Sequence, residues 1–327
     1  IGGVVTIPTT GELKTLPGTL EDPDSGYRSR IDKATEVSTP GYYAVTLTDY
    51  NIKAEITATT RTGFHRYTFP QSATSRILFD IGHKQGESAT ITDAEVTYHP
   101  ETNEVTGWVE NYPIYATFCQ PNGKIKIFFA AKLDKKPQTI GTFIDEKIQE
   151  NSNSVKGPGC GLYLTFPTKA HEQVQMQVGL SYTSIENARN NRDTEIANKS
   201  FNDVKNAARQ TWNELLGRIQ VEGGTPEDKT KFYTGLYHAL LGRGIANDIN
   251  GQYIRHDKTI GQIPLDKNGI PLYSHHNTDG MWGGFWNLTQ IWTLAYPEIF
   301  SSYIKSNLDF FKNSGWLHDG EAAGVYT

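Results

Sequence analysis

The stretch FNDVKNAARQTWNELLGRI (201–219) decides the fold, because the periodicity of the apolar residues changes there. Its apolar side chains recur at steps of four and three, at Val204, Ala208, Trp212, Leu215 and Ile219. That spacing places them on one face of an amphipathic helix. Upstream of this stretch apolar residues alternate with polar ones, and downstream they keep the helical period. The sequence therefore predicts a multidomain chain, β first and α second.

Before this helix the period is two, up to about residue 183. Apolar and polar positions alternate in IKAEITATT (52–60), KIKIFFAA (124–131) and VQMQVGLSY (174–182), as in strands with one buried face. We predict a tight hairpin turn at PNGK (121–124), since Asn-Gly tolerates positive φ, and a loop at NSNSVKGPG (151–159). Many strands without a long helical pattern predict an antiparallel β-sandwich over residues 1–197.

A linker helix over 198–223 and a helical domain over 224–327 are predicted to follow. Thr225 is a candidate N-cap, Pro226 suits a first helical turn, and Asp228 stands three residues after the cap. We therefore expect a helix through KFYTGLYHALL (231–241), then a long loop (242–280) rich in Asp, Asn, Gly and His. Two more helices are predicted at about 284–296 and 298–313, the second starting at Pro297 and ending before Gly315.

Composition bounds the classes of function. The 327 residues suggest about two domains, and the net charge of -5 with a pI near 6.0 argues against nucleic acid as a partner. No apolar run approaches the length of a membrane-spanning helix. Cys119 and Cys160 could form one disulfide or remain two buried thiols. Without an initiator Met or a signal peptide, the chain is expected to be a fragment.

The segment TDGMWGGFWNLTQIW (278–292) holds three of the six tryptophans. Trp282, flanked by glycines in the loop before the helix, is predicted to be a platform on which a sugar ring stacks. Trp286 and Asn287 are placed in the first turn of that helix. With Trp282, the candidate substrate contacts are Asp279, Trp286, Asn287, His275, His276 and Glu321. Trp292 is assigned to core packing, in a stripe with Phe285, Leu288, Ile291 and Ala295.

Asp279 and Glu321 are the acidic residues nearest the aromatic loops, and glycoside hydrolysis needs two carboxyl groups. The sequence does not promote them to that pair, and for Asp279 a helix cap is the favoured interpretation. For the adjacent His275 and His276, local hydrogen bonds are favoured over a shared metal ion. NDINGQY (247–253) resembles a fragment of a calcium loop, although a simple turn is the better interpretation.

Longer blocks of the sequence resemble the exo-acting α-mannosidases of glycoside hydrolase family 92. These blocks are PTTGELK, GYYAVTLTDYNIKAEITATTRTGFHRYTF, VGLSYTSIENARNN, WNELLGRIQVEGGTPEDKTKFYTGLYHALL and NSGWLHDGEAAGVYT, in that order from residue 8 to residue 326. The resemblance implies an N-terminal β-sandwich, linker helices and the beginning of an (α/α)6 barrel. It also implies calcium dependence and hydrolysis of terminal α-mannosides in mannose-containing glycans with inversion.

Two departures from the family pattern qualify what the resemblance implies. The acid and base carboxylates are expected beyond residue 327, on a continuation or a second polypeptide, and an upstream segment with a sugar-contacting aromatic is expected before PTTG. Where many members carry Trp-Asp-Thr, this chain has Trp282-Gly283-Gly284, so the linkage that is cut stays open.

Three alternatives remain open from the sequence. One is a non-catalytic carbohydrate-binding protein, and another is a different glycan-active enzyme built from a sandwich and an α-toroid. In the third, the tryptophans are core and the loops are connectors, which the family resemblance disfavours for the chain as a whole. Glycan-degrading enzymes are usually exported, so a secreted or periplasmic location is expected.

Overall fold

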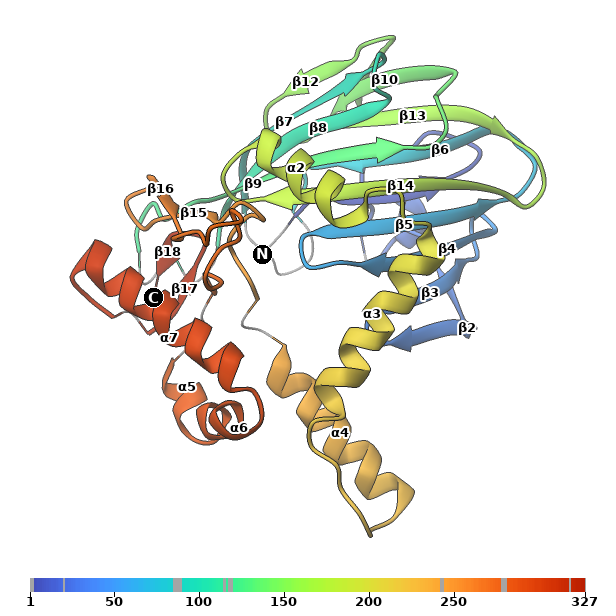
Figure 1. The fold of residues 1–327 in the computed structure, drawn as a ribbon. Helices are drawn as coiled ribbons and strands as arrows, with labels where there is room; N and C mark the ends of the chain where they lie inside the picture. The colour runs from blue at the N-terminus through green and yellow to red at the C-terminus, as the bar shows by residue number, and fades with distance from the viewer. Residues whose placement is uncertain are drawn as a thin grey trace. The chain divides into compact units, whose positions relative to one another are not determined.

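The computed structural model describes residues 3–326, apart from 20, 85–89, 114, 115, 117–119, 242, 243, 278–280 and 318. The chain divides into two compact units (Figure 1). Unit 1 holds residues 1–114 and 126–208, and unit 2 holds residues 115–125 and 209–327. Each unit is described by itself below.

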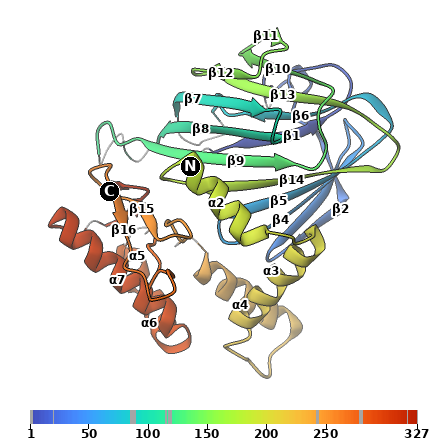
Figure 2. The ribbon, with the colours of Figure 1, turned by 45° about the horizontal axis from the view of Figure 1, so that its top comes forward.

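Unit 1 is built from two antiparallel sheets, seen from a second direction in Figure 2. The first sheet has the strand order β1 (Val5–Thr9), β6 (Ser72–Asp80), β13 (Cys160–Thr168), β10 (Thr139–Ile144) and β11 (Lys147–Glu150). The second has the order β12 (Ser154–Lys156), β7 (Thr90–His99), β8 (Glu104–Tyr112), β9 (Ile125–Leu133), β14 (Glu172–Ser181), β5 (Thr62–Phe69), β4 (Ile52–Ala58), β3 (Tyr42–Leu47) and β2 (Ile31–Thr39).

Aromatic contacts show that the two sheets face each other. Phe79 on β6 stacks on Phe129 on β9 with ring centroids 6.2 Å apart, and Phe166 on β13 meets Phe69 on β5 at 5.8 Å. The alternation predicted for β9 and β14 is confirmed, since Ile127, Phe129 and Val178 are all buried. The predicted antiparallel β-sandwich is therefore the fold of unit 1.

Three predictions about the sandwich need correction. PNGK is a turn, with Asn122 at φ 67°, but β8 ends at Tyr112 and β9 begins at Ile125, so a long connection replaces the tight hairpin. The predicted loop 151–159 contains the short edge strand β12. The sequence also predicts no helix before residue 198, yet α2 spans Ile185–Ile196.

Helix α2 lies on the nine-stranded sheet largely through polar side chains, and its buried apolar residues are Ala188 and Ile196. Its buried residues include Asn187, Asn191 and Arg192. Arg192 Nη1 donates to Glu104 Oε1 at 2.6 Å, and Arg189 Nη2 donates to Glu104 Oε2 at 2.8 Å. Burial alone would raise the pKa of Glu104, but these two guanidinium groups outweigh it and hold the pKa below its ordinary value. The predominantly polar sequence of α2 hides this helix from a search for apolar periodicity.

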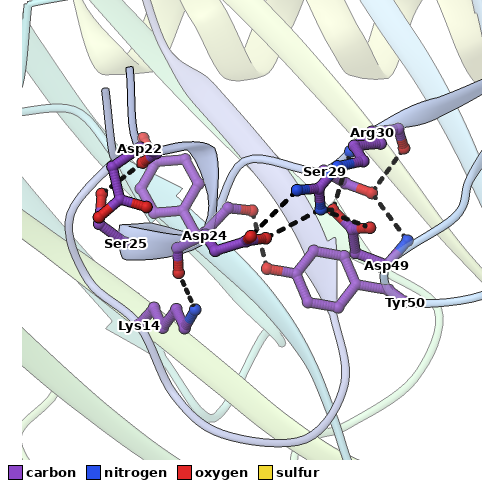
Figure 3. A network of polar contacts seen from close by, with 9 residues as sticks. Lys14, Asp22, Asp24, Ser25, Ser29, Arg30, Asp49 and Tyr50 are labelled. Carbon is purple, nitrogen blue, oxygen red and sulfur yellow. Dashed lines mark hydrogen bonds and ion pairs between the residues drawn. The ribbon is translucent and has the colours of Figure 1, made fainter. Parts of the chain in front are cut away.

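The connection between β1 and β2 is fastened by the polar network in Figure 3. Arg30 pairs with Asp24 at 2.8 Å and with Asp49 at 3.3 Å, and Tyr50 Oη donates to the carbonyl of Tyr27 at 2.8 Å. The ion pairs are largely exposed, so they contribute little to stability. The hydrogen bond from Tyr50 holds the backbone of Tyr27, whose hydroxyl donates to the buried carboxylate of Asp80 at 2.6 Å.

Helix α3 (Phe201–Leu216) begins in unit 1 and ends in unit 2. The longer elements that follow it in unit 2 are helices. They are α4 (Pro226–Leu240), α5 (Met281–Phe285), α6 (Leu288–Ala295) and α7 (Pro297–Ser314). The Thr225–Asp228 capping box begins α4 as predicted, and Gly315 ends α7 at φ 80°. Leu236, Trp292, Tyr296 and Tyr303 form the core, which confirms the assignment of Trp292 to packing. A sandwich followed by helices is the predicted fold class.

The segment expected to be a long loop carries structure of its own. Strands β15 (Gln252–Ile254) and β16 (Ile260–Gln262) pair as a short hairpin, and a bridge joins Ile245 to His276. A second hairpin, β17 (Glu321–Ala322) with β18 (Val325–Tyr326), follows α7. The histidines singled out in the sequence therefore lie in an ordered loop.

Candidate functional site

The His275–His276 segment of unit 2 is anchored to helix α7 by two serines one turn apart. Ser302 Oγ lies 3.1 Å from His276 Nε2, and Ser306 Oγ lies 3.1 Å from His275 Nδ1. The backbone N–H of His276 also donates to Ser306 Oγ at 3.0 Å. Both histidines are buried, with 2% and 5% of their surfaces exposed. Both histidines are hydrogen-bonded, but their partners lie on α7, 26 to 31 residues along the chain, and not locally in the loop as the sequence favoured.

Aromatic rings hold His275 from the other side. Tyr253 on β15 stacks on the His275 imidazole with ring centroids 4.1 Å apart and an angle of 22° between the planes. The Tyr253 hydroxyl donates to the carboxylate of Asp309 on α7. Asn247 Oδ1 accepts from the backbone N–H of His275 at 2.8 Å. The ring of His275 is thus fixed by contacts from the loop and from the helix.

The Ser306–His275 pair has the composition of a nucleophile and its base, but not the access that such a pair needs. Ser306 is 2% exposed, and its Oγ already accepts from the backbone of His276. A buried hydroxyl in this position cannot reach a substrate. The pair therefore positions the loop.

The same loop is tied to the C-terminal hairpin. Asn277 Oδ1 accepts from the backbone N–H of Ala323 at 3.0 Å. Lys258 Nζ donates to the carbonyls of Gly324 at 2.8 Å and Lys124 at 3.1 Å, which adds the 115–125 segment of unit 2. Glu321, a predicted substrate contact, lies on β17 in this hairpin. The hairpin and the histidine segment therefore form one connected framework.

The tryptophan segment is split between two helices and not contained in one. Trp282 lies in the short helix α5, where a loop was expected, and Asp279 lies outside the described residues. Trp286 and Asn287 form the turn between α5 and α6, not a first helical turn. Asn287 occupies the N-cap position of α6 without a side-chain capping bond. This break follows Gly283 and Gly284, and glycine weakens a helix.

Trp286 presents an exposed aromatic surface, with 72% of the residue accessible. Its ring lies 6.1 Å from that of Phe285, which is 68% exposed. Phe285 was assigned to the core stripe, and that prediction is wrong because Phe285 belongs to α5, out of phase with α6. An exposed aromatic pair is the type of surface on which a sugar ring can stack.

The NDINGQY segment is a tight turn. Gly251 N donates to the carbonyl of Asp248 at 2.9 Å, and Gly251 has φ 84°. Among the described residues, no three His, Cys, Asp or Glu side chains gather closely enough to hold a metal ion. The part of the chain that the structure describes therefore does not assemble a calcium ligand set from these residue types.

The residues that position the site were not singled out in the sequence. Ser302 and Ser306 stand four apart on α7, so their common face could have been predicted, but their partners could not. Asn247 and Tyr253 come from the loop, whose fold has no periodic signal.

Cys160 is a buried free cysteine, and burial raises the pKa of its thiol to about 12. Cys119 lies outside the described residues.

Comparison with known families gives matches along both parts of the chain. The family model described as the glycosyl hydrolase family 92 N-terminal domain matches residues 1–181, and the family 92 catalytic domain matches residues 187–327. The chain belongs to glycosyl hydrolase family 92. A search of curated proteins gave no match.

Solved structures of family 92 share this fold. A family GH92 α-mannosidase from Bacteroides thetaiotaomicron is 28% identical, with a TM-score of 0.89 over 100% of this chain and 43% of that one. The same enzyme in complex with mannoimidazole gives the same identity and score, over 100% of this chain and 42% of that one. A family GH92 inverting mannosidase from Bacteroides thetaiotaomicron VPI-5482, 23% identical, has a TM-score of 0.79 over 96% of this chain and 39% of that one. The last likeness concerns the fold alone.

The chain spans less than half the length of these structures. The family 92 catalytic domain model matches this chain from residue 187 to residue 327.

Proposed function

We propose that the complete protein is a glycoside hydrolase that removes terminal mannose from α-linked mannosides. The observation that carries the proposal is the ordered match of both family 92 domains along this chain. It is supported by the 28% identity to a GH92 α-mannosidase whose structure holds mannoimidazole. The substrates are mannose-containing glycans, and the linkage is left to experiment.

The reaction that we propose is a single displacement with inversion. One carboxylic acid protonates the leaving oxygen, and a second carboxylate acts as base on a water molecule that attacks the opposite face of the sugar. We place this pair beyond residue 327, on a continuation or a second polypeptide. The 43% coverage of the relative supports that placement.

This chain would contribute contacts to the sugar. We propose Trp286 and Trp282 as stacking surfaces, because an aromatic ring can pack against the CH face of a pyranose. Asp279, Asn287 and Glu321 would bind sugar hydroxyls through their polar groups. For His275 and His276 we propose a supporting role, since both are buried and bonded to serines of α7.

Calcium is part of the proposal for the complete protein, where it would hold sugar hydroxyls. The described residues gather no set of three His, Cys, Asp or Glu side chains, so the ligands would come from elsewhere in the protein. We derive no step of the reaction from the ion. Export to the periplasm or the medium is proposed from the glycan substrate, and no helix among the described residues is long and apolar enough to cross a membrane.

Mannose release tests the proposal. The complete protein is incubated with α-1,2-, α-1,3- and α-1,6-linked mannobiosides, with calcium and in a parallel series with a chelator. We expect mannose from at least one linkage, and less of it after chelation. Mannobioside binding without release would favour a non-catalytic carbohydrate-binding protein. Release from none of the linkages, with calcium present, would remove the proposed activity.

A further inference from the structure

Unit 1 contains a cavity of about 600 Å³ on the outer face of the nine-stranded sheet. We call it the outer-face pocket. All of its lining residues belong to unit 1. They lie on β5, on β9 and at Asp134 directly after it, on β14, and between the last turn of α2 and the residue before α3. Its volume falls within the range of about 300–1,000 Å³ found for small-molecule sites.

The floor of the pocket is a row of side chains across three neighbouring strands. Gln177 on β14 is paired with Lys132 on β9 on one side and with Phe64 on β5 on the other. Gln175 is two residues away on β14, so its side chain points to the same face as that of Gln177. The buried Val174, Met176 and Val178 point the opposite way, into the sandwich.

The wall of the pocket is the connection between α2 and α3. Helix α2 ends at Ile196, and α3 begins at Phe201, with both residues buried against Phe64. Asn198 turns the chain between them in the left-handed region, at φ 59°. The two helices therefore meet over Phe64 and leave the neighbouring part of the sheet uncovered.

Unpaired amides face this pocket. Within the part of the chain that the structure describes, the side-chain amides of Gln175, Gln177 and Asn198 have no hydrogen-bond partner. Each amide offers both a donor and an acceptor, the combination that a sugar hydroxyl can use in both directions. The apolar part of the lining comes from Phe64, Ile196 and Ala197.

The charged residues of the lining cancel. Lys132 and Lys199 face Asp134 and Asp193 around the pocket, so the formal charge is zero. Asp193 is already paired with Arg192 at 2.8 Å, and Asp134 accepts from the backbone N–H of Gln175 at 2.9 Å. A charged ligand would find no surplus of opposite charge here. A neutral polyol has a smaller desolvation cost, which hydrogen bonds to the amides can offset.

From this arrangement we propose that the outer-face pocket binds a neutral sugar residue of a glycan, with Gln175, Gln177 and Asn198 taking its hydroxyls. The site lies on the sandwich and would give the protein a second place at which to bind a glycan substrate. The choice of mannose as the first probe rests on the proposed function, but the binding chemistry of the pocket does not.

The test uses the complete protein with ¹⁵N-labelled glutamine side chains. The signals of Gln175 and Gln177 are identified by their loss in the Gln175→Ala and Gln177→Ala variants. D-Mannose is titrated into the millimolar range, and D-galactose, N-acetylglucosamine and glucuronate are titrated for comparison. Gln173→Ala is the matched control, because Gln173 is an exposed glutamine on the same face of β14 but outside the pocket lining.

We expect the signals of Gln175 and Gln177 to shift with at least one neutral sugar while that of Gln173 stays in place. The Gln175→Ala/Gln177→Ala double variant lacks both signals, so its affinity is measured by calorimetry. It should bind that sugar about tenfold more weakly, with an unchanged melting temperature. Signals unmoved by every neutral sugar, or moved more strongly by glucuronate, would overturn the inference. Mannose release is measured in parallel. Signal shifts without hydrolysis would contradict only the proposed function. Hydrolysis without signal shifts would contradict only this inference.

Discussion

At the scale of single residues, two tryptophans six positions apart have opposite surroundings. Trp286 is 72% exposed in the turn before α6, whereas Trp292 is 2% exposed and donates from Nε1 to the carbonyl of Ala239 at 3.2 Å. Tryptophan is therefore a surface residue at position 286 and a core residue at position 292. The effects of the two on stability and on substrate binding can be compared directly.

Replacing each tryptophan by alanine should separate stability from substrate binding. Trp292→Ala should lower the free energy of unfolding of unit 2 by about 3–5 kcal/mol, because it empties a packed site. Trp286→Ala should change it by no more than about 0.5 kcal/mol. If Trp286 stacks on the sugar, its loss should lower kcat/KM about tenfold, as expected for about 1.4 kcal/mol of lost contact. Urea titration and mannoside kinetics measure both, and a Trp286→Ala variant with unaltered kcat/KM would contradict the stacking role.

A second residue-scale prediction concerns His83 in unit 1. A hydrogen bond from its ring to Asp80, at 2.9 Å, raises the pKa of His83 above its ordinary value of 6.5 in spite of burial, and Asp145 adds to the effect. The protonated ring therefore stabilises the folded state fully below pH 6.5. That contribution is lost as the pH rises through the raised pKa.

The titration of His83 can be followed by NMR, with His83→Gln to assign its signal. We expect a pKa above 6.5, and a stability difference between wild type and variant that shrinks as the pH rises. The Asp145→Asn variant should lower the pKa only slightly, because Asp145 is the more exposed partner, at 67% of its side chain. A pKa at or below 6.5 in the wild type would show that the ion pair does not form.

At the scale of elements, helix α2 depends on a close approach to strand β14. A Cβ built on Gly179 would lie 2.0 Å from the carbonyl oxygen of Ala188, closer than atoms can approach. The backbone of the helix therefore needs glycine at that point of the strand. By contrast, Gly235 in the middle of α4 has nothing within 4 Å of its would-be Cβ.

Glycine-to-alanine substitutions at these two positions should have opposite effects. Gly179→Ala should destabilise unit 1 by about 1–3 kcal/mol or more, since α2 must move away from the sheet. Gly235→Ala should stabilise α4 by about 0.5–1 kcal/mol, because alanine is the better helix former and no clash opposes it. Hydrogen exchange of the α2 and α4 amides measures each effect locally. Equal protection of α2 in wild type and Gly179→Ala would show that the contact is not tight.

The elements also show what the sequence could and could not predict. The alternation in β9 and β14 and the capping box at Thr225 are local signals, and the structure follows them. Helix α2 was not predicted, because its buried face holds Asn191 and Arg192, whose hydrogen-bond partners come from other parts of the chain. Contacts such as Arg192 with Glu104 depend on sequence positions 88 residues apart, which no period reveals.

The candidate site was only partly predictable for the same reason. The histidine pair could be singled out from the sequence, but its burial and its distant hydrogen-bond partners could not. The serines of α7 and the stacked Tyr253 that hold it come from separate segments. The loop that brings them together folds through a bridge and a hairpin, neither of which has a periodic signal.

At the scale of the whole molecule, two domain models of one family together match nearly the whole chain. The N-terminal and catalytic domain models of family 92 meet between residues 181 and 187, at the end of the sandwich strands and the start of α2. This chain covers 43% of a GH92 α-mannosidase from Bacteroides thetaiotaomicron. In the proposed function, this chain supplies sugar contacts and the remainder of the protein supplies the acid and the base.

The stereochemistry of the product tests the central claim most directly. The complete protein is mixed with an α-linked mannobioside that it cleaves, and ¹H NMR follows the anomeric protons from the first minutes. The account predicts that β-mannose appears first and then mutarotates, because inversion at an α-mannoside gives the β anomer. α-Mannose as the first product would contradict inversion and with it the proposed single displacement.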